Sequence, residues 1–511
     1  MTASPGAPPT PSAARVVAGG LGLPLLAGAA CVLAFAPFYA WPVAIAGLAI
    51  LFAVWAASGS PRQAWLSGYA FGLGYFLAGV SWVFVSLHRY GGMPAFLAAL
   101  ATFLFCAYLA LFPALAGWLA VRWGGARRGR RLAVACAAYV AFEWLRGSGT
   151  FAAGFPWLGI GTSQAPSSPL AGFAPWLGGY GVSLAVTAAA ALAAGIATGG
   201  AAPRVRYALT LALAALFAAG ALARLPAWTE PAGAPISVAL LQGNVPQELK
   251  WRDEVRDRTL AEYRRMILAA DARVVVVPET ALPAFLDELP AGYLESLRED
   301  ARSHGKDILL GTVERVRRDG DYDYYNSLVR ITGPERQTYR KRHLVPFGEF
   351  IPPGFAWVLA ILHIPMSDMS RGTATQPPIA AGGTRFGVAI CYEDMFGEEV
   401  IDALPAAGVL VNVSNDAWFG HSLEQEQHLQ ASQMRALETG RWMVRSTNTG
   451  VTAAIDPRGH VVSKLAEYTR GTLVATVVPR TGRTPYARTG NLPVLAITFA
   501  ALVAFRRRAT L

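Results

Sequence analysis

Two patterns of apolar and polar residues divide the chain near residue 225. The first part consists of long, nearly uncharged apolar runs, whereas residues 226–488 alternate short apolar runs with amphipathic stretches. A helix needs about 20 apolar residues to cross a bilayer. Apolar runs therefore predict about eight transmembrane helices, at 15–38, 41–58, 64–87, 94–121, 131–145, 170–198, 205–225 and 490–505.

The second pattern predicts an α/β domain, because strand-like and helix-like stretches follow one another. Short runs rich in β-branched residues predict strands at ISVALLQ, RVVVV, DILLGTV, YYNSLVRIT, RQTYRK, RFGVAI, GVLVNVS, WMVRSTN, TAAIDP and TLVATVV. Apolar residues at helical spacing predict helices at 251–270, 291–305 and 423–440.

One apolar run, FAWVLAILHIPM at 355–366, interrupts the polar domain. It is too short to span a bilayer, so it forms either a buried core helix or an arm that dips into the membrane. The flanking prolines and Trp357 favour the arm, which we expect to act as a mobile lid between the site and the lipid.

The charges indicate how the chain is oriented in the membrane. Only 15% of the residues are charged, against about 25% in soluble domains. The net charge of +11 comes largely from arginines clustered between apolar runs, which argues against nucleic-acid binding. The clusters fall on one side of the predicted spans: Arg15, Arg62, the 122–131 segment, Arg204 with Arg206, and Arg506–Arg508. The positive-inside rule then places both termini in the cytoplasm and residues 226–488 outside it.

These patterns predict three parts: a seven-helix bundle at 1–225, a catalytic domain at 226–488, and a last transmembrane helix with an arginine-rich tail at 489–511. Two loops on the outer side, 88–94 and 147–169, are rich in glycine, proline and aromatic residues. The second loop is either a plain connector or a segment at the membrane interface, where Trp157 serves as an anchor. Its aromatic, charge-free character favours a lipid-facing or substrate-lining role.

Cys391 is the only cysteine of the polar domain and follows the strand-like run FGVAI. The other three, Cys31, Cys106 and Cys136, lie in apolar runs and are read as packing residues. A structural disulfide within the polar domain is therefore excluded. We predict that Cys391 is a nucleophile, which requires a base and a positive neighbour.

Glu279 and Lys341 also stand where strand-like runs end. Glu279, in the PETALP turn, is the predicted general base, and Lys341 is the predicted stabiliser of an oxyanion together with the backbone N–H of Tyr392. Each also has a plainer interpretation as a surface strand-end residue. Glu349 and Glu393 are predicted to hold the lysine and the base in place.

Other common site types find no support in the sequence. The spacing of His343, His421 and His428 does not match a metal site, and no phosphate-binding glycine loop or GxSxG motif is present. We therefore expect no metal and no cofactor.

The set Glu279, Lys341 and Cys391 resembles the Glu-Lys-Cys triad of the nitrilase superfamily, whose fold is an αββα sandwich. Further stretches resemble the apolipoprotein N-acyltransferase family, the membrane-embedded branch of that superfamily in the Gram-negative inner membrane. They are LQGNVPQELKW, VPETALP, KRHLVPFGEFIP, CYED, NVSNDAWFG, FEWLRG and GFPWLGIG. The implied fold class is a membrane α-helical bundle plus an α/β nitrilase-like αββα sandwich.

The resemblance implies a two-step acyl transfer without a cofactor. A phospholipid, typically phosphatidylethanolamine, gives its sn-1 chain to Cys391, and the thioester then acylates the α-amine of the diacylglyceryl-cysteine of an apolipoprotein. The family's supporting and substrate-binding positions correspond here to Trp251, Glu349, Tyr392, Glu393, Asn415, Asp416 and Trp418. Two alternatives remain at this point, a membrane-tethered amidase acting on a small C–N substrate and a transporter with a large external domain. The scarcity of ionisable residues in the spans disfavours the transporter.

Overall fold

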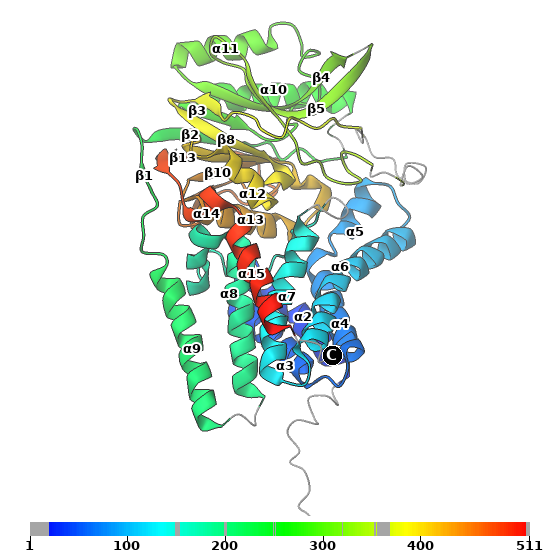
Figure 1. The fold of residues 1–511 in the computed structure, drawn as a ribbon. Coiled ribbons are helices and arrows are strands. Elements are labelled where there is room, and N and C mark those ends of the chain that lie inside the picture. Colours follow the sequence, from blue (N-terminus) through cyan, green and yellow to red (C-terminus); the bar gives the residue numbers. More distant parts are fainter. Residues whose placement is uncertain are drawn as a thin grey trace, which may run out of the picture.

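The computed structural model describes residues 20–148, 154–198, 202–248, 250, 252–318, 320–351, 354 and 368–506. Trp251 and the predicted arm at 355–366 lie outside these residues. A bundle of helices forms one half of the molecule and two stacked sheets with their covering helices form the other (Figure 1).

Helices lie in the described part of every segment predicted to span the membrane. They are α2 (Gly22–Cys31, continued by η1, Val32–Ala34), α3 (Pro42–Ala57), α4 (Pro61–Val80), α6 (Ala95–Gly124), α7 (Arg128–Gly147), α8 (Ala174–Ala197), α9 (Pro203–Leu222) and α15 (Leu492–Phe505). Among the described residues, three helical segments are long and apolar enough to cross a membrane: 95–124, 169–197 and 203–222. A fourth arises if α4 and the segment Val83–Tyr90, bent by 56° against it, count as one span.

Small residues let these helices approach closely, as is common between membrane helices. A Cβ on Gly28 of α2 would lie 2.0 Å from the carbonyl oxygen of Phe71 in α4. A Cβ on Gly74 of α4 would lie 2.0 Å from the carbonyl oxygen of Leu25 in α2. Larger residues at either position would force α2 and α4 apart.

The second half is an αββα sandwich, as expected. One sheet has the order β12-β11-β10-β9-β8-β7 and the other β13-β2-β3-β4-β5-β6. Strands β8, β9 and β10 run parallel, as do β2, β3 and β4. The first sheet consists of β7 (Ile379–Ala381), β8 (Thr384–Ile390), β9 (Val409–Ser414), β10 (Met443–Thr447), β11 (Ala453–Ile455) and β12 (Val461–Lys464). The second consists of β2 (Ile236–Gln242), β3 (Val274–Val277), β4 (Asp307–Arg318), β5 (Asp321–Arg330), β6 (Gln337–Arg340) and β13 (Gly471–Val477).

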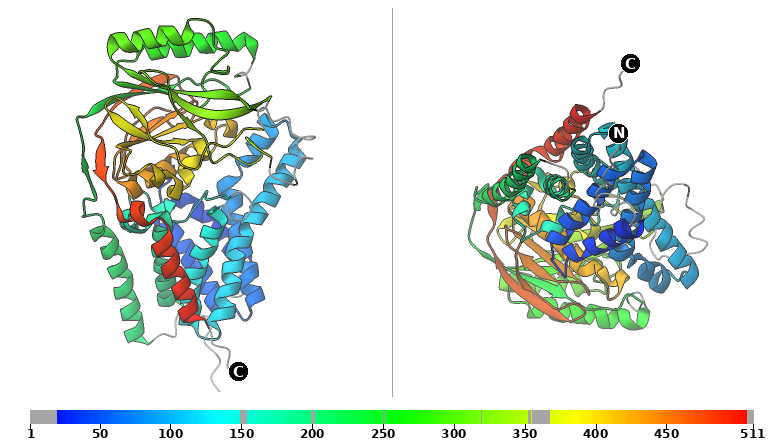
Figure 2. Two further views of the ribbon diagram at one scale, coloured as in Figure 1. Left: turned by 45° about the horizontal axis from the view of Figure 1, so that its top comes forward. Right: turned by 90° about the horizontal axis from the view of Figure 1, so that it is seen from below.

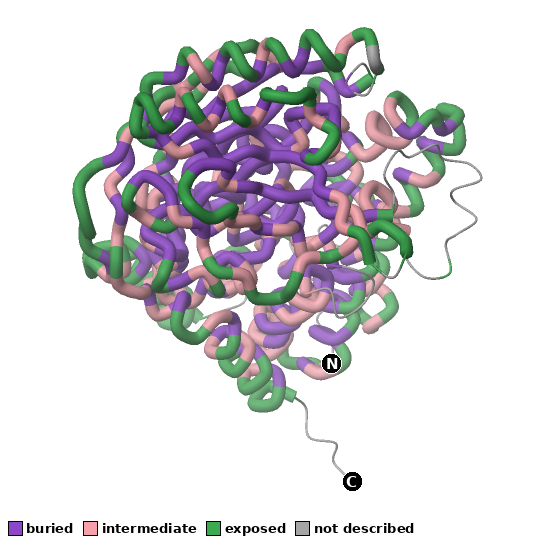
Figure 3. The backbone as a smooth tube through the Cα atoms, turned by 90° about the horizontal axis from the view of Figure 1, so that it is seen from above, coloured by how far each residue is buried: buried purple, intermediate pink, exposed green. Residues whose placement is uncertain are grey.

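Fully buried strand residues such as Val276, Leu309, Val411 and Val444 fill the space between the sheets. Helices α10 (Asp253–Ala269) and α11 (Tyr293–His304) cover the outer face of one sheet. Helix α13 (Glu424–Thr439) covers the other sheet on the side of the membrane helices (Figures 1 and 2). Seen from above, the helix layer over the second sheet carries exposed residues on its outer side, and the strands beneath it are buried (Figure 3). Helix α13 is instead buried over nearly its whole length.

The chain enters and leaves the sandwich through two strands that lie side by side. Strand β1 (Thr229–Pro231), which follows α9, pairs antiparallel with β14 (Arg480–Gly482), which precedes α14 (Pro485–Thr489) and α15. The connections from the sandwich to helices α9 and α15 therefore start from one paired set of strands.

The expected role of Trp157 as a membrane-interface anchor is wrong. Its side chain is only 3% exposed, and Nε1 donates a hydrogen bond to Oε1 of Gln427 at 2.7 Å. The indole ring also stacks on Tyr392, with centroids 6.4 Å apart. The sequence shows an aromatic loop without charge, but not that helix α13 and the residue after Cys391 cover it.

Candidate active site

The three predicted chemical groups come together between the two sheets. Glu279 follows β3, Lys341 follows β6, and Cys391 follows β8. Nζ of Lys341 lies 3.3 Å from Oε1 of Glu279, and both charges act on the thiol of Cys391. The side chains of Glu279 and Lys341 are 7% and 1% exposed, so their interaction is shielded from water.

Glu279 is held by three donors. Its Oε1 accepts from Nζ of Lys341 and, at 2.7 Å, from Nδ2 of Asn326, and its Oε2 accepts from the backbone N–H of Asn415 at 2.7 Å. Gly311 of β4 permits the turn to pack closely, since a Cβ there would lie 1.9 Å from the carbonyl oxygen of Pro278. The carboxylate is thus fixed in place by its three hydrogen-bond donors.

Lys341 lies between two carboxylates. Its Nζ contacts Glu279 and, at 2.9 Å, Oε2 of Glu349. Burial alone would lower the pKa of Lys341, but Glu349, Glu279 and Cys391 outweigh it and hold the pKa well above its ordinary value. The lysine therefore remains a cation throughout the physiological pH range, as a stabiliser of negative charge requires.

Asn326 is a site residue that the sequence analysis missed. Its Nδ2 donates to Glu279 and, at 2.9 Å, to Oε1 of Glu349. Its backbone carbonyl accepts from the backbone N–H of Lys341 at 2.8 Å. It lies inside β5, where its only sequence signal is an amide in an otherwise ordinary strand. One side chain thus sets the positions of both acids around the lysine.

Cys391 occupies a backbone conformation that is uncommon for a residue with a side chain, with φ of 54°. The turn lies where β8 ends and the 3₁₀ helix η6 (Cys391–Met395) begins. Burial first and the charge of Glu279 second raise the pKa of the thiol well above its ordinary value, although Lys341 opposes the shift. The resting group is therefore a neutral thiol that needs a base during attack, and Glu279 is the adjacent carboxylate.

Glu349, Tyr392 and Glu393 connect the three loops. Glu349 forms an ion pair with Lys341. The buried Glu393 accepts from the backbone N–H groups of Arg342, at 2.7 Å, and Ile390, at 2.7 Å, which joins the segment after the lysine to the strand before the cysteine. The hydroxyl of Tyr392 donates to the backbone carbonyl of Gly154 at 3.2 Å. Gly154 belongs to the helical part of the molecule within residues 1–225, called the membrane half below.

Residues of the NVSNDAWFG segment contact Glu279 and the residues around it. Asn415 binds Glu279 through its backbone and donates from Nδ2 to Oε1 of Gln247 at 2.8 Å. Asp416 is fully buried and pairs with Arg445, with Oδ2 2.9 Å from Nη2. Trp418 packs its ring edge-on against Tyr90 of the membrane half, with centroids 6.0 Å apart. Trp251 lies outside the described residues.

A possible metal cluster that the sequence did not indicate is formed by Asp416, Glu424 and His428, whose ligand atoms lie within 4.8 Å of one another. The guanidinium of Arg445 lies beside this cluster and supplies the positive charge that a metal ion would bring. Its Nη2 is 2.9 Å from Asp416 and 2.8 Å from Nδ1 of His428. These residues therefore already contain their cation.

Cys391 belongs to two apolar environments at once. It packs against the core between the sheets and against the apolar cluster of the membrane helices, which also contains Trp82, Trp157 and Phe419. The rings of Trp82 and Phe419 meet edge-on, with centroids 4.8 Å apart. The thiol thus lies where the core of the sandwich meets the apolar cluster of the membrane half.

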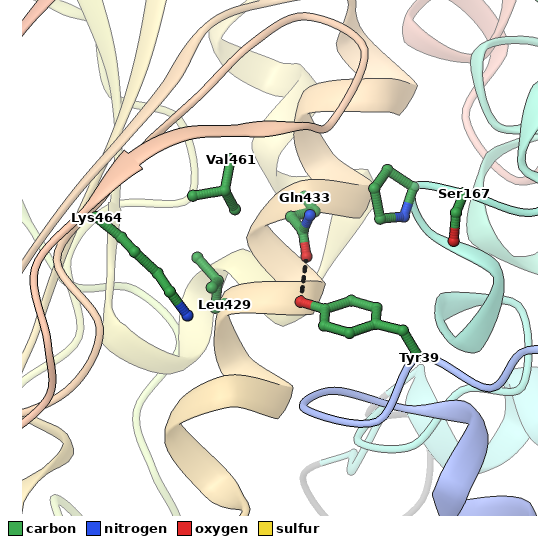
Figure 4. Close-up of a pocket in the computed structure, with 7 residues that line it drawn as sticks. Tyr39, Ser167, Leu429, Gln433, Val461 and Lys464 are labelled. Atoms are coloured by element: carbon green, nitrogen blue, oxygen red, sulfur yellow. Dashed lines mark hydrogen bonds between the residues drawn. The ribbon is translucent and has the colours of Figure 1, made fainter.

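A separate cavity of about 310 Å³ lies where the membrane half meets helix α13 and β12 (Figure 4). Tyr39, Ser167, Gln433 and Lys464 are among its lining residues, and the Tyr39 hydroxyl donates to Gln433 at 3.0 Å. None of the predicted site residues that the structure describes lines this cavity.

Lys250 is a buried ammonium near Glu279 that the sequence analysis did not single out. Its Nζ donates to Oγ1 of Thr280 at 2.7 Å, and no carboxylate of the described residues forms an ion pair with it. Burial lowers its pKa to about 8, although the nearby Glu279 acts in the opposite direction. The folded protein thus carries a poorly compensated charge beside Glu279.

We expect Lys250→Met to stabilise the protein at pH 6.5. The folded pKa lies below the unfolded value of about 10.4, so the cost of the buried charge is present below pH 8 and disappears as the pH rises. Removing the charge is expected to contribute about 1–3 kcal/mol at pH 6.5, after the lost hydrogen bond is subtracted. Thermal unfolding in detergent at pH 6.5 and pH 9.5 measures this. Lys464→Met, which removes an exposed lysine paired with Glu426, is the control, and a gain that does not shrink with pH contradicts the explanation.

Comparison with known proteins agrees with this geometry in both halves of the chain. Residues 27–192 match the family model for the apolipoprotein N-acyltransferase N-terminal domain, and residues 237–486 match that for carbon-nitrogen hydrolase. The chain is 47% identical over 488 residues to the apolipoprotein N-acyltransferase of Nitrosomonas europaea, covering 93% of this chain and 95% of the relative. It is 44% identical over 502 residues to that of Ralstonia nicotianae, covering 95% and 94%, and 46% identical over 493 residues to that of Methylococcus capsulatus, covering 95% and 96%. Because these similarities extend over nearly the full length of this chain and of each relative, the chain belongs to the apolipoprotein N-acyltransferase family.

Proposed function

We propose that the protein moves the sn-1 acyl chain of a phospholipid, such as phosphatidylethanolamine, to Cys391. The chain then passes to the α-amine of the diacylglyceryl-cysteine that begins an apolipoprotein. The observation that carries the proposal is the position of Cys391, which packs against the apolar cluster of the membrane helices as well as the core of the sandwich. Withdrawing an acyl chain from a bilayer costs about 0.8 kcal/mol per CH₂. A thiol that meets the chain at the membrane avoids most of this cost.

In the first step, Glu279 takes the proton of the Cys391 thiol as the sulfur attacks the ester carbonyl of the phospholipid. Lys341 and the N–H of Tyr392 stabilise the oxyanion that forms. The carbon–oxygen bond to the glycerol then breaks, and Glu279 returns the proton to the departing alkoxide. The products are a thioester on Cys391 and a lysophospholipid.

In the second step, the neutral α-amine of the apolipoprotein attacks the thioester. Glu279 takes a proton from the nitrogen as the carbon–sulfur bond breaks, and then protonates the sulfur of Cys391. An α-amine has a pKa near 8, so a fair fraction is neutral at physiological pH. The product is the triacylated lipoprotein, and the enzyme returns to its starting state.

Supporting roles follow from the contacts. Glu349 and Asn326 hold Lys341 and Glu279, Glu393 joins the loops of the lysine and the cysteine, and Asn415 orients Glu279. We also assign Tyr392, Asp416 and Trp418 to the shape of the site, and Trp251 to the substrate side on the family resemblance alone.

The membrane arrangement is also part of the proposal. It has eight transmembrane helices, seven within 1–225 and one within 489–511, with both termini in the cytoplasm and the catalytic domain 226–488 in the periplasm of a Gram-negative inner membrane. Helices in all the predicted segments and the one-sided arginine clusters support it.

Mass spectrometry tests the chemistry directly. The purified protein is mixed with phosphatidylethanolamine that carries distinguishable sn-1 and sn-2 chains. We expect one sn-1 acyl adduct on Cys391, equal release of lysophospholipid, and loss of the adduct when a diacylated lipopeptide is added. An adduct mapped to another residue contradicts the proposal, and ammonia release from small amides without any need for lipid selects the amidase instead.

A further inference from the structure

A second group of buried charged residues lies behind the nucleophile and takes no part in the proton transfers above. It consists of Asp394 of η6, Asp416 of η8 (Asp416–Phe419), His428 of α13 and Arg445 of β10. All four side chains are 0–1% exposed. Arg445 is at the centre, within 3.4 Å of both aspartates and 2.8 Å from Nδ1 of His428.

This group contacts Cys391 through the carbonyl oxygen of its backbone. That oxygen accepts from Nδ2 of Asn412 at 3.0 Å and from Nε2 of His428 at 3.2 Å. A non-glycine residue with positive φ, such as Cys391 at 54°, is strained and persists only when its surroundings hold it. The two hydrogen bonds are contacts of this kind.

The carbonyl of Cys391 and the N–H of Tyr392 belong to the same planar peptide unit and point in opposite directions. Any group that fixes the direction of the carbonyl therefore also fixes the direction of the N–H. That N–H is the backbone donor assigned to the oxyanion. His428 thus acts on the oxyanion site from the far side of one peptide bond.

The orientation of His428 is itself determined by its neighbours. Nε2 faces two acceptors, the Cys391 carbonyl and, at 2.8 Å, Oδ1 of Asp394, so this nitrogen carries a proton in either charge state of the ring. Asp394 is held by the hydroxyl of Ser432 at 2.5 Å. The ring of Trp157, from the membrane half, packs against the imidazole with centroids 5.4 Å apart.

We propose that His428 is a positioning residue that aims the peptide between Cys391 and Tyr392, and thereby the oxyanion-binding N–H. The inference rests on the proposed function, since it concerns the same nucleophile. It predicts that His428 matters for reactions at Cys391 that pass through an oxyanion, and not for reactions that do not.

Two reactions of the same thiol separate these cases. Acylation by phospholipid forms an oxyanion, whereas alkylation by iodoacetamide is a direct displacement at carbon and forms none. We expect His428→Ala to slow single-turnover acylation of Cys391 by about 10- to 100-fold, since loss of an oxyanion donor costs roughly 10²–10³ and here the donor is only misdirected. Alkylation of Cys391 in the same variant should change by less than about threefold.

Two amide variants provide the internal control. In His428→Gln the side-chain nitrogen lies near the position of Nε2, whereas in His428→Asn it lies near that of Nδ1. We expect the glutamine variant to acylate at least about 10-fold faster than the asparagine variant, with matched unfolding temperatures. Equal rates in these two variants, or equal losses of acylation and alkylation, would overturn the inference.

The experiment on the wild-type protein distinguishes a failure of this inference from a failure of the proposed function. If wild-type Cys391 is not acylated by phospholipid, the proposed function fails, and a p-nitrophenyl ester replaces the phospholipid as acyl donor in every arm. The ratio between the glutamine and asparagine variants then still tests the role of His428.

Discussion

Cys391→Ala is expected to reduce acyl transfer from phospholipid to a diacylated lipopeptide to the uncatalysed background. The thioester cannot form without the sulfur, and no other cysteine substitutes for it. Cys31 and Cys106 are buried within the membrane half, and Cys136 contacts Thr187 there. Transfer of a labelled fatty acid to the lipopeptide, followed by gel or mass analysis, measures the loss.

The matched control is Cys136→Ala, which also removes one thiol but far from the sandwich core. It should retain transfer within about twofold of the wild type. Because the Cys391 side chain packs in both apolar clusters, the unfolding temperature of Cys391→Ala is compared as well. Residual transfer by a well-folded Cys391→Ala protein would refute a thioester on this residue.

Glu279→Gln is expected to slow acyl-enzyme formation by roughly 10³-fold, within the 10²–10⁴ range of general acid–base catalysis. Glutamine keeps the size of the side chain, but its single oxygen can accept from either Asn326 or Asn415 and not from both, so the unfolding temperature of the variant is compared as well. Glutamine cannot take the thiol proton, and burial already disfavours the thiolate of Cys391. Lys341 keeps an ion pair through Glu349. The rate of adduct formation in a single turnover is the measurement.

Glu299→Gln, which removes an exposed carboxylate paired with Arg302 on α11, is the control and should leave the rate unchanged. Alkylation by iodoacetamide adds a second criterion. Because Glu279 acts on the thiol proton, its loss should slow alkylation as well as acylation, unlike the loss of His428. Unimpaired alkylation in Glu279→Gln would show that this carboxylate is not the base for the thiol.

Much of the sandwich could be predicted from the sequence. The run VVVV before Glu279 and FGVAI before Cys391 are buried strands, and all ten predicted strands and three predicted helices of this half are present. Four strands were missed: β1, β7, β12 and β14. Each has only three or four residues, so the sequence signal for these strands is weak, although β3, β6 and β11 are equally short and were predicted.

The site was only partly predictable. Glu279, Lys341 and Cys391 each follow an apolar run, which singled them out in the sequence, and in the structure they lie close together. Asn326 and His428 gave no such signal, because an amide in a strand and a histidine in a helix gain their importance from partners 47 and 37 residues away. Trp157 was misjudged for the same reason, since its partner Gln427 is 270 residues distant.

The contacts of the membrane half with Tyr392 and His428 bear on how this enzyme can be engineered. Gly154 accepts from the Tyr392 hydroxyl, and Trp157 packs on both Tyr392 and His428. A sandwich expressed on its own would therefore lose one wall of its nucleophile turn, even if every strand formed. A truncated, water-soluble version is therefore expected to need replacements for the contacts of these two residues before its thiol works.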